Sequence, residues 1–158
     1  MNCYEELVDF ADKHGLEVIE KHFRSSVKGL CKGNKIGISK AIETTAEKRC
    51  VLAEEMAHCL YTVGDILDTR NLAALKQEKL ARTAAYEFLL PINKLIDAYF
   101  NCSHNLNEIP EYLEVTWEFY YNTIKHYSRK FGGATTHEEY VIYFSPLFVC
   151  EIHHVNAV

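Results

Sequence analysis

The chain has 158 residues and a formal net charge of -5, and 48% of its residues are hydrophobic while 25% are charged. This length suits one domain with a real hydrophobic core, and this composition excludes an intrinsically disordered chain. The negative charge disfavours a general nucleic-acid-binding protein, because contacts to phosphates require basic surface.

The first residues, the lack of a long apolar run and the cysteines indicate the compartment of the protein. The first residues, MNCYEELVDFADKHG, carry acids early and lack the apolar run of a signal peptide. No stretch approaches the roughly 20 apolar residues that a membrane span requires. We interpret the cysteines as reduced, mostly buried thiols rather than a disulfide framework, since they are scattered without a Cys-x-x-Cys pair. We therefore expect a cytoplasmic protein with no membrane partner. The cysteines are Cys3, Cys31, Cys50, Cys59, Cys102 and Cys150.

The first forty residues predict a helix and a small sheet. Apolar residues recur with helical spacing over residues 5–14, and Gly15 is a plausible stop. Residues 16–20 (LEVIE) predict a strand. Residues 27–39 contain two β-rich runs around Gly33 and Asn34, which is typical of a hairpin.

The middle of the chain predicts helices. Thr44 and Glu47 have capping-box spacing and open a helix that runs to about Tyr61, followed by a turn at Gly64-Asp65. A second long helix is expected over residues 72–90, ended by Pro91, and a short helix over residues 91–99. The apolar stripe expected on the first of these helices comprises Leu52, Met56, Cys59 and Leu60.

The last third predicts a helical pair and two strands. Residues 105–115 and 116–131 indicate two helices joined by a tight turn, with Thr116 as the cap of the second. Gly132-Gly133 closes that helix. The alternating runs EYVIYF and LFVCEI predict two strands around a turn at Ser145-Pro146. The whole pattern indicates one α+β domain spanning residues 1–158.

One stretch of the first long helix could carry chemistry. In LAEEMAHCL (residues 52–60), Glu54 and His58 are four residues apart and so project from one helix face. Glu55 stands three residues before His58, as in the second half of the zinc-protease signature His-Glu-x-x-His. Carboxylates and imidazoles both bind zinc. The spacing alone leaves open a solvated Glu/His face, and a catalytic site needs a third ligand, for which Glu78 on the next helix is a candidate.

The surroundings of this motif resemble the ImmA/IrrE family of metallopeptidases, in its phage and mobile-element branch. The similarity is carried by the run EKRCVLAEEMAHCLYTVGDILD (residues 47–68) and by a second helix in which Glu78 precedes Pro91 by thirteen residues, with alanines between. The runs LEVIEKHFRSSVKGLCKGNKIGIS, YLEVTWEF and YVIYFSPLFVCEI are also similar to the family, so the resemblance covers nearly the whole chain.

The resemblance implies a zincin-like fold: an N-terminal helix and small β-sheet, a Glu-x-x-His helix packed on a second ligand-bearing helix, further helices and a C-terminal β-hairpin. It makes His58 and Glu78 ligands of Zn²⁺ and Glu55 the general base. Glu54 takes the place of the family's first His. As a ligand it would leave the metal less positive, and it could instead act from beside the ligands. Tyr61, His126 and Tyr127 are eligible by type to steady an oxyanion, and the sequence does not choose among them.

The resemblance also implies a partner. Proteins of this branch act as anti-repressors that cleave, or promote cleavage of, a helix-turn-helix repressor. The alternative is a repressor-binding protein that keeps the fold without proteolysis. Direct nucleic-acid binding is not expected, because the helical window after residue 105 is acidic and would repel phosphates. Its acids are Glu108, Glu111, Glu114 and Glu118.

Overall fold

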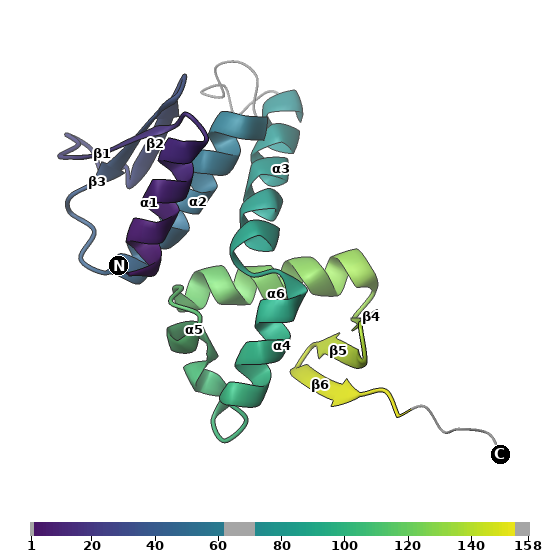
Figure 1. The fold of residues 1–158 in the computed structure, drawn as a ribbon. Coiled ribbons are helices and arrows are strands. Elements are labelled where there is room, and N and C mark those ends of the chain that lie inside the picture. Colours follow the sequence, from purple (N-terminus) through teal and green to yellow (C-terminus); the bar gives the residue numbers. More distant parts are fainter. Residues whose placement is uncertain (1, 62–71, 154–158) are drawn as a thin grey trace.

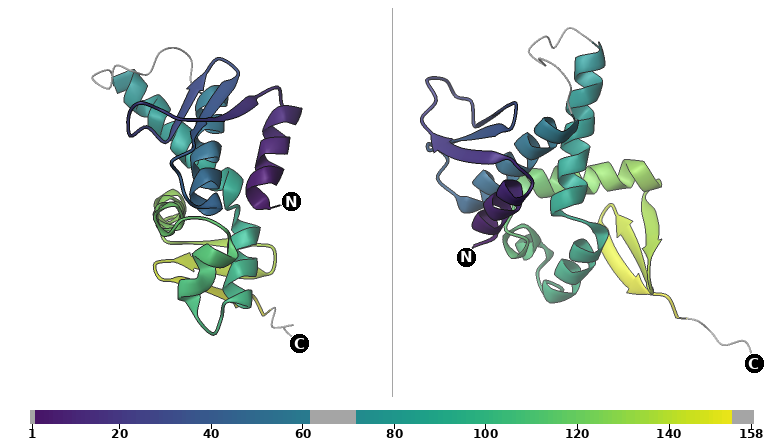
Figure 2. Two further views of the ribbon diagram at one scale, coloured as in Figure 1. Left: turned by 90° about the vertical axis from the view of Figure 1, so that its left-hand side faces the viewer. Right: turned by 45° about the horizontal axis from the view of Figure 1, so that its top comes forward.

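The computed structural model describes residues 2–61 and 72–153. It has two halves, each with helices and a three-stranded sheet, and they meet across helix α6 (Figure 1). Helix α6 runs between them, with α1, α2, α3 and the first sheet on one side and α4, α5 and the second sheet on the other. Figure 2 shows the two sheets at opposite ends of the described chain. The expected α+β class is confirmed.

The N-terminal half begins with α1 (Cys3–Lys13), whose first turn is closed by a capping box between Asn2 and Glu5. Gly15, at φ +77°, then reverses the chain, a conformation that suits glycine because it lacks a Cβ. The predicted hairpin is confirmed around Gly33-Asn34, and its first strand lies at the edge of the sheet, in the order β1-β3-β2. Strand β1 pairs in parallel with β3. The strands are β1 (Glu17–Lys21), β2 (Gly29–Lys32) and β3 (Lys35–Ser39).

Helices α2 (Thr45–Tyr61) and α3 (Leu72–Leu89) form the centre of this half and pack along each other. The Thr44 hydroxyl accepts a hydrogen bond from the Glu47 N–H at 3.2 Å, as the capping pattern predicts. Both helices bury alanines, which lets two backbones approach closely. These alanines are Ala53 and Ala57 on α2 and Ala81 and Ala85 on α3. Leu60 is an exception to the predicted stripe, since it is 60% exposed, and the turn predicted at Gly64-Asp65 lies outside the described residues.

The second half opens at Pro91 with α4 (Ile92–Asn101) and continues through a short 3-10 turn and α5 to α6 (Trp117–Phe131). The Thr116 hydroxyl accepts from the Phe119 N–H at 3.1 Å, which confirms the predicted cap. Gly132, in the left-handed region at φ 68°, ends α6. The 3-10 turn is Leu106–Glu108 and α5 is Ile109–Tyr112.

The predicted C-terminal hairpin was incomplete. It is the outer part of an antiparallel three-stranded sheet in the order β4-β5-β6. The added strand has the sequence ATTH, which lacks apolar alternation and gains strand structure by pairing with β5. The strands are β4 (Ala134–His137), β5 (Tyr140–Phe144) and β6 (Leu147–Glu151).

One buried cation joins the two halves. Arg49 on α2 is only 7% exposed, and its Nη1 donates hydrogen bonds to the carbonyls of Leu113 and Glu114, the latter at 3.2 Å. These carbonyls follow α5 and precede α6, so Arg49 fixes α2 against the start of α6. That start also presents Thr116 to the Cys50 sulfur, its N–H lying 3.5 Å away.

The cysteine prediction was wrong for one pair. Cys31 on β2 and Cys59 on α2 form a disulfide across 28 residues of sequence. Neither residue has a local signal for pairing, since they meet only when the hairpin folds onto α2. Four cysteines stay free, of which two are buried as expected; these four are Cys3, Cys50, Cys102 and Cys150.

Candidate metal centre

The candidate ligands lie on two helices, α2 and α3, that pack along each other. Glu54 and His58 project from one face of α2, one turn apart, and Glu78 comes from the facing turn of α3. The Nε2 atom of His58 lies 3.4 Å from Oε2 of Glu78. The pair is partly sheltered, with 17% of the His58 side chain and 31% of the Glu78 side chain exposed. The structure thus brings together two of the three predicted ligands.

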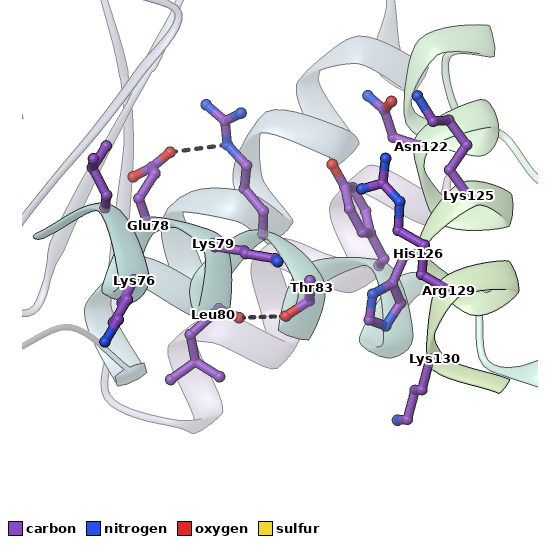
Figure 3. A pocket seen from close by; sticks show the side chains of 13 residues that line it. Lys76, Glu78, Lys79, Leu80, Thr83, Asn122, Lys125, His126, Arg129 and Lys130 are labelled. Carbon is purple, nitrogen blue, oxygen red and sulfur yellow. Dashed lines mark hydrogen bonds and ion pairs between the residues drawn. The ribbon is translucent and has the colours of Figure 1, made fainter. Parts of the chain in front are cut away.

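Arg82 orients the Glu78 carboxylate. It lies one turn further along α3, and its Nε is 2.9 Å from Oε1 of Glu78 (Figure 3). The two oxygens of Glu78 are therefore divided: Oε1 faces Arg82 and Oε2 faces His58. Sequence reasoning missed Arg82, although its spacing of four residues from Glu78 is the usual signal for a helical ion pair.

The charges of Glu78 and Arg82 also act on Glu54. Burial raises the pKa of Glu54, the guanidinium of Arg82 opposes that shift, and the carboxylates of Glu78 and Glu118 reinforce it. Glu118 belongs to the first turn of α6. The start of α6, against which Arg49 holds α2, therefore adds a negative charge near Glu54. A cation among these carboxylates would relieve their mutual repulsion.

Glu55 lies against the edge strand β2, and the charges of Glu54 and Glu78 also act on it. Its carboxylate interacts with the backbone of Cys31, an interaction that favours the charged form. Burial nevertheless raises the pKa of Glu55 to about 7, with a further contribution from the charge of Glu54. The strand approaches so closely that a Cβ added at Gly29 would lie 2.7 Å from Cγ of Glu55. A carboxyl with this pKa can exchange a proton near neutral pH, as a general base must.

In protein freed of metal by a chelator, we expect the free energy of unfolding to fall as the pH rises from about 5 to about 8. The pKa of Glu55 is higher in the folded chain, about 7, than in the unfolded chain, so folding takes up a proton between these values. The resulting stability is complete below the unfolded pKa and is lost as the pH rises through about 7. Glu55→Gln should reduce this loss by roughly 1–3 kcal/mol. Urea unfolding at several pH values measures this difference. If the free energy of unfolding fell equally with pH in the wild type and in Glu55→Gln, the burial of Glu55 would be contradicted.

The donor geometry fits a zinc ion. Two ligand atoms, each bonded to a tetrahedral zinc at about 2.0–2.1 Å, lie about 3.3 Å apart. The 3.4 Å between His58 Nε2 and Glu78 Oε2 matches this separation and is long for a direct hydrogen bond. Within residues 2–61 and 72–153, no three His, Cys, Asp or Glu side chains converge closely enough to hold a metal ion. Glu54 as a third ligand therefore stays a prediction.

The three oxyanion candidates differ in their surroundings. The Tyr127 hydroxyl is buried and donates to the Leu90 carbonyl at 3.0 Å, so it supports the junction of α3 and α4. The His126 Nε2 lies 2.7 Å from a carboxylate oxygen of Glu87. Tyr61 ends α2 and is 52% exposed. Of the three, Tyr127 is buried, His126 is partly exposed and Tyr61 is exposed.

Tyr86 is a neighbour that sequence reasoning missed. It lies two turns after Glu78 on α3, is 9% exposed, and its pKa is raised by burial and by the charge of Glu54. Tyr86 also lines the same pocket as Glu78. Its spacing of eight residues from Glu78 was the available sequence signal.

Comparison with known proteins identifies a family. The sequence profile of a peptidase family, Peptidase_M78, described as the IrrE N-terminal-like domain, matches residues 11–125. That stretch contains α2 and α3 with all four candidate residues, and extends into α6. No curated protein and no solved structure matches the chain. None of the described helices is long and apolar enough to cross a membrane. Because the matched stretch covers well over half of the sequence, the chain belongs to the metallopeptidase-like family of the IrrE N-terminal-like domain.

Proposed function

We propose that this protein is a zinc-dependent metallo-endopeptidase, and that it acts as an anti-repressor on a helix-turn-helix repressor of a phage or mobile element. Membership of a metallopeptidase-like family supports the chemistry. The observation that carries the proposal is the 3.4 Å separation of His58 Nε2 and Glu78 Oε2, which is the separation of two zinc ligands.

His58 and Glu78 would hold the zinc ion, with Glu54 as the third ligand or close beside it. When bound, the ion supplies a Lewis acid that polarises a scissile carbonyl and acidifies water. Arg82 keeps Oε1 of Glu78 occupied, which leaves Oε2 directed at His58.

Glu55 would accept a proton from the attacking water and pass it to the leaving amine. Three features suit it to this role: a partly buried carboxyl, a pKa of about 7, and a fixed position against the backbone of Cys31. Its place beside the edge strand β2 puts the base next to backbone that can pair with an extended peptide.

The second candidate is a repressor-binding protein without proteolysis. Two observations favour it: Glu54 stands where the family resemblance implies an imidazole, and Arg82 already pairs with Glu78. A carboxylate at position 54 would make a bound zinc ion less positive. The ion pair with Arg82 makes the Glu78 carboxylate less available to a metal. In this case the fold would sequester the repressor rather than cut it.

The test is incubation of the purified protein, with zinc and with a chelator, with helix-turn-helix repressors encoded near its gene. We expect discrete repressor fragments only in the presence of zinc, identified by intact-mass spectrometry. An intact repressor that co-purifies with the protein under both conditions would establish the second candidate instead.

A further inference from the structure

A groove rich in basic residues leads away from the candidate metal centre. It has a volume of about 720 Å³ and lies between α3 and α6, with Glu78 among its lining residues. Six of the 17 lysines and arginines of this net-negative chain line it. In Figure 3, Lys76 and Lys79 come from one of the two helices, and Lys125, Arg129 and Lys130 come from the other. We call this feature the basic groove; its cations are Lys76, Lys79, Arg82, Lys125, Arg129 and Lys130.

Most of these cations lack an acidic partner among residues 2–61 and 72–153. Arg82 pairs with Glu78, and Lys130 pairs with Glu87 at 2.7 Å. Among the described residues, the groove cations without an ion pair are Lys76, Lys79, Lys125 and Arg129. They stand three or four residues apart on their helices, where like charges repel each other. An acidic ligand in the groove would relieve that repulsion.

We infer that the basic groove binds an acidic segment of the protein substrate, one in which Asp or Glu residues alternate with apolar residues. The inference rests on the proposed function, because the groove starts at Glu78, where a peptide substrate would lie. Between the cations, Leu75 is 48% exposed and Leu80 is 53% exposed, which offers apolar contacts to a peptide.

A nucleic-acid backbone fits this surface less well. It carries phosphates but few apolar groups to cover Leu75 and Leu80. Glu118, in the first turn of α6, would also repel phosphates that extended along that helix past the groove.

Fluorescence polarisation with the full chain tests the inference. The protein carries Glu55→Gln, so that the probe stays uncut, and the buffer contains zinc. The probe is a fluorescein-labelled peptide of alternating glutamate and leucine, compared with a lysine-leucine peptide and an oligothymidine. We expect the acidic peptide alone to bind, with an affinity that falls as ionic strength rises.

Charge reversal identifies the surface. Lys125→Glu with Arg129→Glu should weaken binding of the acidic peptide by at least about tenfold. Lys76→Glu with Lys79→Glu should do the same from the opposite helix. The matched control, Lys13→Glu with Arg24→Glu, changes exposed cations outside the groove and should bind as before. Thermal melts confirm that each variant is folded.

The inference is overturned if the acidic peptide fails to bind, if groove and control variants bind it equally, or if oligothymidine binds more tightly and is lost in the groove variants. These results are independent of catalysis. Repressor cleavage without acidic-peptide binding would remove this inference alone, and binding without metal-dependent cleavage would remove the proposed enzyme alone.

Discussion

Glu55→Gln should lower the rate of repressor cleavage by roughly 100- to 10,000-fold, the usual contribution of a general base. Gln has nearly the same shape as Glu but cannot take up a proton. The variant keeps the place of the side chain against β2 and leaves His58 and Glu78 untouched, so repressor affinity should stay near that of the wild type. Single-turnover cleavage and a separate binding titration measure the two effects.

Glu43→Gln is the matched control for that prediction, because Glu43 is exposed and lies before α2. It should cleave at the wild-type rate. Cleavage by Glu55→Gln at the rate of this control would show that Glu55 is not the base, and the repressor-binding alternative would then account for any derepression.

Arg49→Met should lower the free energy of unfolding by about 3 kcal/mol. Methionine keeps the apolar volume of the side chain but cannot donate to the carbonyls of Leu113 and Glu114, which would lose a charged donor in a sheltered place. Urea unfolding measures the change.

Arg24→Met is the control for this second effect, since Arg24 is exposed on the loop between β1 and β2. It should change stability by less than about 0.5 kcal/mol. A similarly small change in Arg49→Met would mean that the carbonyls find other partners and that α2 does not depend on this contact for its place against α6.

Local signals explain which elements the sequence predicts well. Thr44 places the start of α2, Pro91 ends α3, and Gly33-Asn34 fixes the hairpin, because each acts on the backbone within a few residues. Strand β4 has no such signal and forms by pairing with β5. The disulfide between Cys31 and Cys59 likewise depends on a tertiary contact.

The candidate site also has a part that local sequence predicts and a part that depends on tertiary contacts. The spacing of Glu54, Glu55 and His58 is visible in one stretch of sequence, and a helix places them as expected. Glu78 has no local link to them: it is a candidate because it lies on the next helix, and the family resemblance then makes it a ligand. The structure adds the 3.4 Å approach to His58 and the neighbour Arg82. The contact of Glu55 with β2 depends on how the hairpin of β2 and β3 packs on α2. The spacing of residues within α2 does not encode this packing.

The metal content of the purified protein tests the central claim most directly. After zinc loading and dialysis, mass spectrometry should find about one zinc per chain in the wild type and almost none in His58→Ala and Glu78→Ala. The same measurement on Glu54→Ala decides whether that carboxylate is a ligand. A wild-type protein without zinc, or variants that retain it fully, would contradict a metal centre at His58 and Glu78.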